Sequence, residues 1–195
     1  MTLLYLIRHG ETEFNAKKAC YGWIDCSLNQ KGFQQAQKVA ELLKDVSFDV
    51  VISSPLKRAR ETAAIVSKVS SEEIILDERL KELNFGSWEG KHYQRIEQED
   101  PENWRIWINN WKEAAPPGGE SFKDMYRRVE ESIKDILEKY ADESLLLVSH
   151  QGCLRTIICV LLNMGYEGFM HFSFKQDTYS LLEVKNGFCV VKKIN

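Results

Sequence analysis

The stretch LLYLIRHG, residues 3–10, decides the fold. Its first five residues are apolar and too few for a helix, and the run stops at a charge and a glycine, which is typical of a buried β-strand. Strands of this kind, separated by helices, belong to a largely parallel sheet that is covered on both faces. The residues that follow this strand, Arg8, His9 and Gly10, are therefore expected at the carboxyl end of the sheet.

Strands and helices alternate along the rest of the chain. Further strands are predicted at residues 50–52, 74–76 and 145–148, and helices at residues 56–69, 121–140 and 153–162. Asn29 is typical of a helix cap, and Phe33, Ala36, Val39, Ala40 and Leu43 form an apolar stripe after it. Residues 179–191 predict a terminal hairpin across Asn186 and Gly187. The pattern predicts an α/β fold, a three-layer α/β/α sandwich with a mostly parallel central sheet.

Residues 88–119 differ from this pattern because they are rich in aromatic and acidic side chains. Trp104, Trp107 and Trp111 are spaced to share one helical face, which fits either a packed core or a ligand platform. We expect one domain over residues 1–195, with this segment forming a helical cap over the site.

The composition excludes several classes of protein. The net charge of −3 gives no electrostatic reason to expect nucleic acid or a membrane surface as a partner. The longest apolar stretch without a charge, residues 156–166, is far shorter than the ~20 residues of a membrane helix, and the N-terminus lacks the pattern of a signal peptide. Five scattered cysteines without a CxxC pair favour reduced thiols over a zinc site. We expect a cytoplasmic protein; an oligomer is not indicated.

Charged and nucleophilic side chains follow three separate strands. Arg8 and His9 follow the first strand, Arg58 begins the helix after the second, and His150 follows the strand at 145–148. Ligands bind at the carboxyl ends of strands in an open parallel sheet, and paired arginines suit a phosphate. A neutral histidine there can act as a nucleophile, and a carboxylic acid can protonate the leaving oxygen. Glu82 is the best-placed acid, and Glu11 is the second candidate.

Each of these residues also has a purely structural interpretation. A histidine at a strand end is often a hydrogen-bonded structural group, and Arg58 and Arg60 fit a solvated helix face. Glu82 alone is indistinguishable from a surface acid. The coincidence of these side chains at strand ends is what favours a site.

Five motifs in this order resemble the histidine phosphatase superfamily, also called the phosphoglycerate mutase-like family. They span nearly the whole chain: LIRHGET at 6–12 with Asn15, GW at 22–23, SSPLKRA at 53–59, ELNFGSWEG at 82–90 and SHQG at 149–152. The resemblance implies that His9 carries the phosphoryl group and that Glu82 donates the proton. It also implies the phosphate-holding and substrate-contacting residues, which are Arg8, Arg58, His150, Asn15, Gly22, Gln151 and Gly152.

The same resemblance implies no metal and no cofactor, and a small phosphomonoester as the substrate; an oligomer through the terminal hairpin stays open. The motifs QEDPENW at 98–104, PPGGESF at 116–122 and HFSFKQD at 171–177 are similar to those of α-ribazole phosphatases, which act in cobalamin nucleotide-loop assembly. The expected reaction is therefore hydrolysis of α-ribazole 5'-phosphate through a phosphohistidine intermediate. The alternatives are a phosphoglycerate mutase, a broad-specificity sugar-phosphate phosphatase and a catalytically silent phosphate-binding module on the same fold.

Overall fold

A computed structural model describes residues 1–194. The strands are β1 (Thr2–Arg8), β2 (Ala19–Cys20), β3 (Val50–Ser53), β4 (Ile75–Leu76), β5 (Lys91–His92), β6 (Ser144–Ser149), β7 (Ser180–Lys185) and β8 (Phe188–Lys193). The α-helices are α1 (Glu13–Ala16), α2 (Gln30–Leu42), α3 (Lys57–Ser67), α4 (Tyr93–Glu99), α5 (Pro101–Asn109), α6 (Phe122–Lys139) and α7 (Gln151–Leu161). Three 3₁₀ turns complete the chain: η1 (Glu78–Leu80), η2 (Gly86–Trp88) and η3 (Tyr166–His171).

The main sheet has six strands in the order β4-β3-β6-β1-β7-β8. Its first four strands are parallel, and β7 and β8 add an antiparallel edge. Asn186 and Gly187 both have positive φ, at 50° and 76°, as the two central residues of the predicted hairpin turn require. The predicted α/β fold with a mostly parallel sheet is confirmed.

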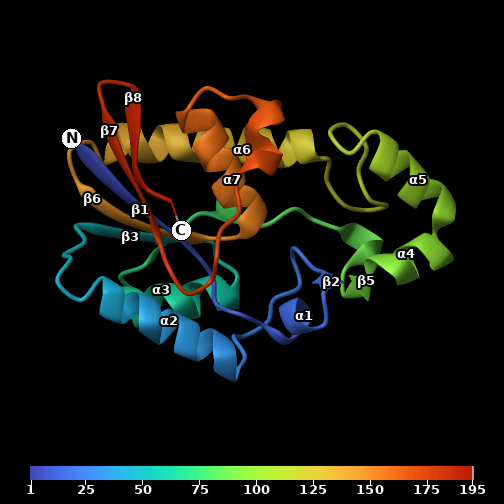
Figure 1. Cartoon of the computed structure of the whole chain (residues 1–195), viewed down its shortest axis with the longest axis horizontal. Helices are drawn as coiled ribbons and strands as arrows, with labels where there is room; N and C mark the ends of the chain where they lie inside the picture. Colours follow the sequence, from blue (N-terminus) through green and yellow to red (C-terminus); the bar gives the residue numbers. More distant parts are fainter. Residues whose placement is uncertain (195) are drawn as a thin grey trace.

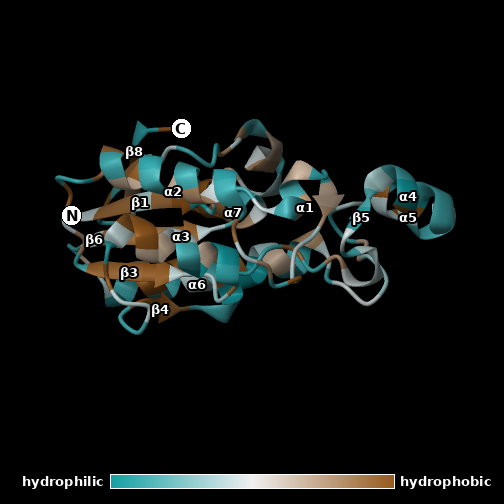
Figure 2. Ribbon diagram, turned by 90° about the horizontal axis from the view of Figure 1, so that it is seen from below, coloured by the Kyte–Doolittle hydropathy of each residue, from teal (hydrophilic) through white to brown (hydrophobic). Residues whose placement is uncertain are grey.

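The helices cover both faces of this sheet, as Figure 1 shows for α2 and α3 on one side and α6 and α7 on the other. Successive side chains of a strand point to opposite faces. Leu4 and Leu6 of β1 accordingly belong to the core beneath α6 and α7, whereas Tyr5 and Ile7 belong to the core beneath α2 and α3. Figure 2 shows the hydrophobic strands lying between helices whose outer surfaces are hydrophilic.

Local capping fixes where two of the helices begin. Asn29 caps α2 by accepting a hydrogen bond from the amide of Gly32, as predicted. Ser121 and Asp124 form a reciprocal capping box at the start of α6. Phe33 was expected in the core, but it is 40% exposed. Gly32 is buried instead. It packs so closely against the backbone of Glu11 that a Cβ at this position would lie 2.1 Å from the carbonyl oxygen of Glu11.

The aromatic segment contributes α4 and α5, which lie at one end of the molecule, away from the sheet (Figures 1 and 2). Trp104 and Trp107 stack on each other in α5, with ring centres 5.5 Å apart. Trp111 does not share their helical face, because α5 ends at Asn109, and Trp111 packs instead against Phe122, 4.6 Å between ring centres. No helix within residues 1–194 is long and apolar enough to cross a membrane.

Candidate active site

A cavity of about 420 Å³ lies at the carboxyl end of β1. Among the predicted site residues, those that line it are Arg8, His9, Asn15, Arg58, Glu82, Gln151 and Gly152. His150 is fully buried beside them, with its ring centre 5.0 Å from that of His9. Residues from three separate strand ends therefore meet at one place, as the sequence predicts.

The imidazole of His9 is held in one tautomer. Its Nδ1 lies 2.7 Å from the carbonyl oxygen of Gly10, and because a carbonyl only accepts, Nδ1 carries the hydrogen. The other ring nitrogen, Nε2, then bears the free lone pair. Burial lowers the pKa of His9 well below its usual value, and the charges of Arg58 and Arg8 lower it further. A neutral imidazole with an unprotonated Nε2 is the form that can attack an electrophile.

Two guanidinium groups flank this histidine, and the charge of Glu82 acts on one of them, Arg8, from beyond ion-pair distance. Arg58 is fully buried and donates to the carbonyl oxygens of Gly22 (2.6 Å) and Ile24 (2.8 Å), and its guanidinium carbon lies 4.6 Å from the ring centre of Tyr21. Arg8 donates to the carbonyl of Phe174 at 3.1 Å. Within residues 1–194 neither arginine forms an ion pair, and both Nε atoms are buried without a hydrogen-bond partner. Buried cations that lack a direct ion-pair partner favour an anionic ligand.

His150 is buried beside the lining residues. We call the group of Arg8, His9, Arg58 and His150 the cationic end of the cavity, after its two arginines. His150 is the N-cap residue of α7, and its Nε2 lies 2.8 Å from the hydroxyl of Ser54. Burial first, and the charge of Arg58 second, hold its pKa well below the usual value. Its Nδ1 is buried and has no hydrogen-bond partner in the described part of the chain.

Glu82 lies at the border of the cationic end. Its carboxylate accepts hydrogen bonds from the amides of Leu83 (3.0 Å) and Gly152 (2.9 Å). A Cβ at Gly152 would lie 2.3 Å from one oxygen of this carboxylate, so the glycine is what allows the close approach. Glu11, the second candidate acid, lies outside the cavity lining and pairs with Lys31 at 2.6 Å. Of the two acids, only Glu82 is placed for proton transfer in the cavity.

The remaining predicted contacts differ in position. Asn15 lines the cavity, and its side-chain oxygen accepts from the hydroxyl of Tyr21 at 2.7 Å. Gln151 lines it too and accepts from the amide of Phe174 at 3.1 Å. Gly22 is not a lining residue; its carbonyl holds Arg58, and its amide donates to Glu89 at 2.9 Å. The backbone at Gly22 therefore orients a cation of the site.

Ala19, Cys20 and Tyr21 also line the cavity, and most of its remaining lining is apolar side chains that sequence reasoning did not identify as site residues. This surface, which we call the apolar wall, consists of Leu83, Phe85, Trp107, Ile108, Trp111, Phe122, Met125, Phe169 and Met170. The tryptophan pattern was the only signal that pointed to it. Phe169 and Met170 come from the 3₁₀ turn η3, which has no periodic pattern in the sequence.

Arg155 was also missed, since by position it is an ordinary helix residue. It lines the cavity from α7, donates to the carbonyl of Phe172 at 2.5 Å and lies 5.3 Å from the ring centre of Phe169. Within residues 1–194, no group of three or more His, Cys, Asp or Glu side chains is arranged to hold a metal ion.

Comparison with known proteins agrees with this geometry. Residues 4–195 match the model of the histidine phosphatase superfamily, branch 1. The chain is 37% identical over 192 residues to the adenosylcobalamin/alpha-ribazole phosphatase of Escherichia coli strain K12, covering 98% of this chain and 95% of that protein. The crystal structure of the alpha-ribazole phosphatase from Shigella flexneri superimposes with a TM-score of 0.93 at 38% identity, covering 99% and 96% of the two chains. Phosphoserine phosphatase 1 of Hydrogenobacter thermophilus is 30% identical over 195 residues, 100% of this chain and 92% of its own.

Proposed function

The chain belongs to the histidine phosphatase superfamily, branch 1, and is a phosphomonoester hydrolase; from this premise we propose that its substrate is α-ribazole 5'-phosphate. The observation that carries the proposal is the pairing of a cationic end with a broad apolar wall in one cavity. The substrate has the matching parts, a phosphate at one end and a flat, apolar dimethylbenzimidazole base at the other. Aromatic side chains such as Trp107, Trp111 and Phe169 suit the faces and edges of such a base.

In the proposed first step, Nε2 of His9 attacks the phosphorus atom. The bond between phosphorus and the ribose 5'-oxygen breaks, and Glu82, in its acid form, gives its proton to that oxygen. The products are α-ribazole and a phosphohistidine. Arg8, Arg58 and His150 stabilise the charge that develops on the phosphoryl oxygens, since their positions are fixed before the reaction begins.

In the second step, a water molecule attacks the phosphorus atom of the phosphohistidine. The carboxylate of Glu82 takes a proton from this water, the bond between phosphorus and Nε2 breaks, and inorganic phosphate leaves. His9 returns to its neutral form and Glu82 to its acid form. Asn15, Gln151 and Gly152, which line the same cavity, contact the substrate in this scheme, and the backbone at Gly22 acts by holding Arg58.

Small, strongly charged phosphates fit the cavity less well. Phosphoserine and 3-phosphoglycerate each carry a carboxylate and have no apolar group to bury against the wall. Placing them there leaves the aromatic surface in contact with water and gains no hydrophobic stabilisation. The apolar wall therefore favours α-ribazole 5'-phosphate over a phosphoglycerate mutase or phosphoserine phosphatase reaction.

A substrate panel tests the proposal. Initial rates would be measured for α-ribazole 5'-phosphate, 3-phosphoglycerate, fructose 2,6-bisphosphate and phosphoserine. We expect kcat/KM for α-ribazole 5'-phosphate to exceed each of the others by at least about tenfold, which corresponds to about 1.4 kcal/mol of selective binding in the transition state. Comparable values for all four would instead indicate a broad-specificity phosphatase.

A further inference from the structure

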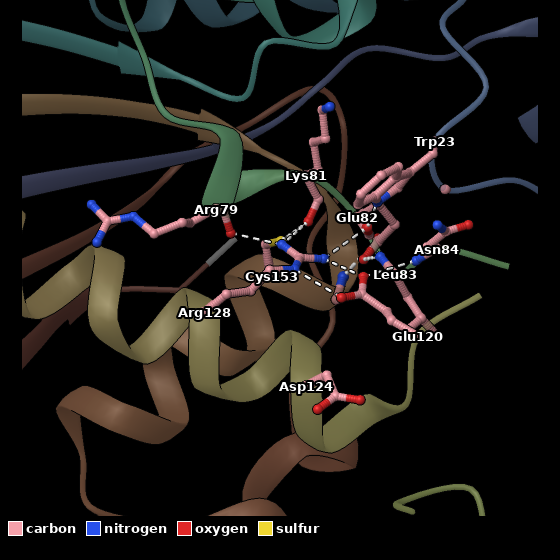
Figure 3. A network of polar contacts seen from close by, with 12 residues as sticks. Trp23, Arg79, Lys81, Glu82, Leu83, Asn84, Glu120, Asp124, Arg128 and Cys153 are labelled. Atoms are coloured by element: carbon pink, nitrogen blue, oxygen red, sulfur yellow. Dashed lines mark hydrogen bonds and ion pairs between the residues drawn. The ribbon is translucent and has the colours of Figure 1, made fainter. Parts of the chain in front are cut away.

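The loop that carries Glu82 has no regular secondary structure of its own. It follows the short turn η1 and runs through residues 81–85 before η2. A loop of this kind needs other contacts to hold a catalytic side chain in place, because a misplacement of about 1 Å can cost ~10²-fold in rate. Figure 3 shows that Arg128 of α6 lies at the centre of such contacts.

Side chains satisfy every carbonyl oxygen from residue 79 to residue 82. Arg128 supplies three of these hydrogen bonds, to the carbonyls of Arg79 (2.7 Å), Lys81 (2.6 Å) and Glu82 (3.0 Å). The hydroxyl of Ser149 and the thiol of Cys153 donate to Leu80, the same thiol donates to Lys81, and the indole of Trp23 donates to Glu82. A single guanidinium thus spans the loop up to the backbone of Glu82 itself.

Glu120 fixes the position of this guanidinium. Its carboxylate accepts from Arg128 at 2.5 and 3.0 Å, and both side chains are largely buried, with 16% and 17% exposed. The same carboxylate accepts from the amide of Asn84 at 2.9 Å. The pair therefore holds the loop on both sides of Glu82, by carbonyls before it and by an amide after it. Charged hydrogen bonds of this geometry are among the stronger ones in proteins.

Arg128 itself is not a lining residue of the cavity. It stands on a long helix whose first turn is fixed by the capping box at Ser121, so its base is rigid. The opposite side of the loop is limited by Gly152, against which the carboxylate of Glu82 already lies. With a rigid support behind the backbone and a rigid helix end in front of the carboxylate, the side chain of Glu82 has little freedom to move.

We propose that Arg128, held by Glu120, is the residue that positions the carboxyl group of Glu82 for proton transfer. This inference rests on the proposed role of Glu82 as proton donor. Arg128 acts through the backbone of the loop, so it is a positioning residue and not a catalytic one.

The test compares two phosphate esters of similar shape. They differ in how strongly the departure of the leaving group depends on protonation by an acid. Benzyl phosphate releases an alkoxide, which requires a proton, whereas 4-nitrophenyl phosphate releases a stable phenolate. Since kcat/KM reports the step in which the leaving group departs, we expect Arg128→Gln to lower it about 10²-fold for benzyl phosphate and less than about fivefold for 4-nitrophenyl phosphate. Inhibition by inorganic phosphate, which reports the cationic end, should stay within about twofold of the wild type.

Arg127→Gln is the matched control, because Arg127 is the preceding residue of the same helix and pairs only loosely with Asp124, at 4.0 Å, within the described chain. It should leave both esters unchanged. If Arg128→Gln does not fold, Arg128→Lys decides, since one ammonium group cannot span three carbonyls. A selective loss of about tenfold or more on benzyl phosphate supports the proposal, and wild-type activity on that ester overturns it.

The Glu82→Gln variant distinguishes a failure of the proton-donor role of Glu82 from a failure of the positioning role of Arg128. Selective loss on benzyl phosphate in Glu82→Gln, together with equal losses on both esters in Arg128→Gln, overturns the positioning role and leaves the proton donor intact. The absence of selectivity in Glu82→Gln overturns both. Selective loss in both variants supports both.

Discussion

The cationic end and the apolar wall of the cavity are built in different ways. The cationic end consists of side chains placed at the ends of buried strands and at the starts of α3 and α7, and each of its four members forms a hydrogen bond to a backbone carbonyl or a hydroxyl group. The apolar wall is assembled from three separate parts of the chain: the loop at residues 83–85, the stretch from α5 to the start of α6, and the turn η3. In the proposed reaction the first end acts on the phosphate, whereas the second is a packed apolar surface that contacts the rest of the substrate.

The largest expected effect comes from removing the nucleophile at the cationic end. We expect His9→Ala to reduce kcat by about 10⁴-fold or more on any phosphomonoester, because no phosphohistidine can form. The backbone of β1 is held by its neighbours β6 and β7, so the fold should remain. Steady-state rates and circular dichroism check this. A folded His9→Ala variant that retains substantial activity would place the nucleophile elsewhere.

The next effect comes from Gly152, against which the carboxylate of Glu82 lies. In Gly152→Ala the new Cβ would lie 2.3 Å from the carboxylate of Glu82, so this carboxylate must leave its observed position. We expect a loss of about 10²-fold in kcat/KM on benzyl phosphate with little change in melting temperature, because the atom that must move is the end of a side chain. Unchanged kcat/KM on this ester would show that the position of the carboxylate is not critical.

A smaller effect is expected at the apolar wall. Trp107→Ala should raise KM for α-ribazole 5'-phosphate about tenfold and leave kcat within about twofold, because the indole belongs to the apolar wall and forms no hydrogen bond or ring contact with His9 or Glu82 in the described chain. Trp104→Ala is the matched control, since Trp104 stacks on Trp107 in the same helix without lining the cavity. Equal effects of the two variants on KM would show that the helix serves only as a packed cover.

The cationic end and the apolar wall also differ in how much of each can be predicted from the sequence. Arg8, His9 and His150 are recognisable because a parallel sheet brings strand ends together, and strands are local features of the sequence. Trp111 and Phe169 contact each other, with ring centres 5.9 Å apart, only because distant segments fold over α6. No periodic pattern encodes such a contact, so the apolar wall had to be seen in the structure.

Arg128 illustrates a second limit of sequence reasoning. A helix arginine beside another arginine resembles a solvated face, yet Arg127 is 67% exposed and Arg128 only 17%. The difference is that Arg128 donates hydrogen bonds to backbone carbonyls of the loop that carries Glu82. The position of this loop beside α6 depends on the tertiary structure, so the local sequence around Arg128 does not predict it. Phe33 is the reverse case. The apolar stripe of its helix predicts a core residue, but the structure exposes its side chain.

The smallest expected effect concerns the stability of the cationic end at low pH. Burial lowers the pKa of His9 and of His150 in the folded protein, whereas in the unfolded chain both titrate near 6.5. Below about pH 6.5 the unfolded state therefore binds protons that the folded state does not, so the free energy of unfolding falls as the pH falls, by up to about 1.4 kcal/mol per pH unit for each histidine. His9→Gln removes one of these groups and should reduce this slope by about 1 kcal/mol per pH unit between pH 6 and 5. Urea unfolding of both proteins at several pH values measures the difference, and parallel curves would mean that folded His9 takes up a proton as readily as the unfolded chain does.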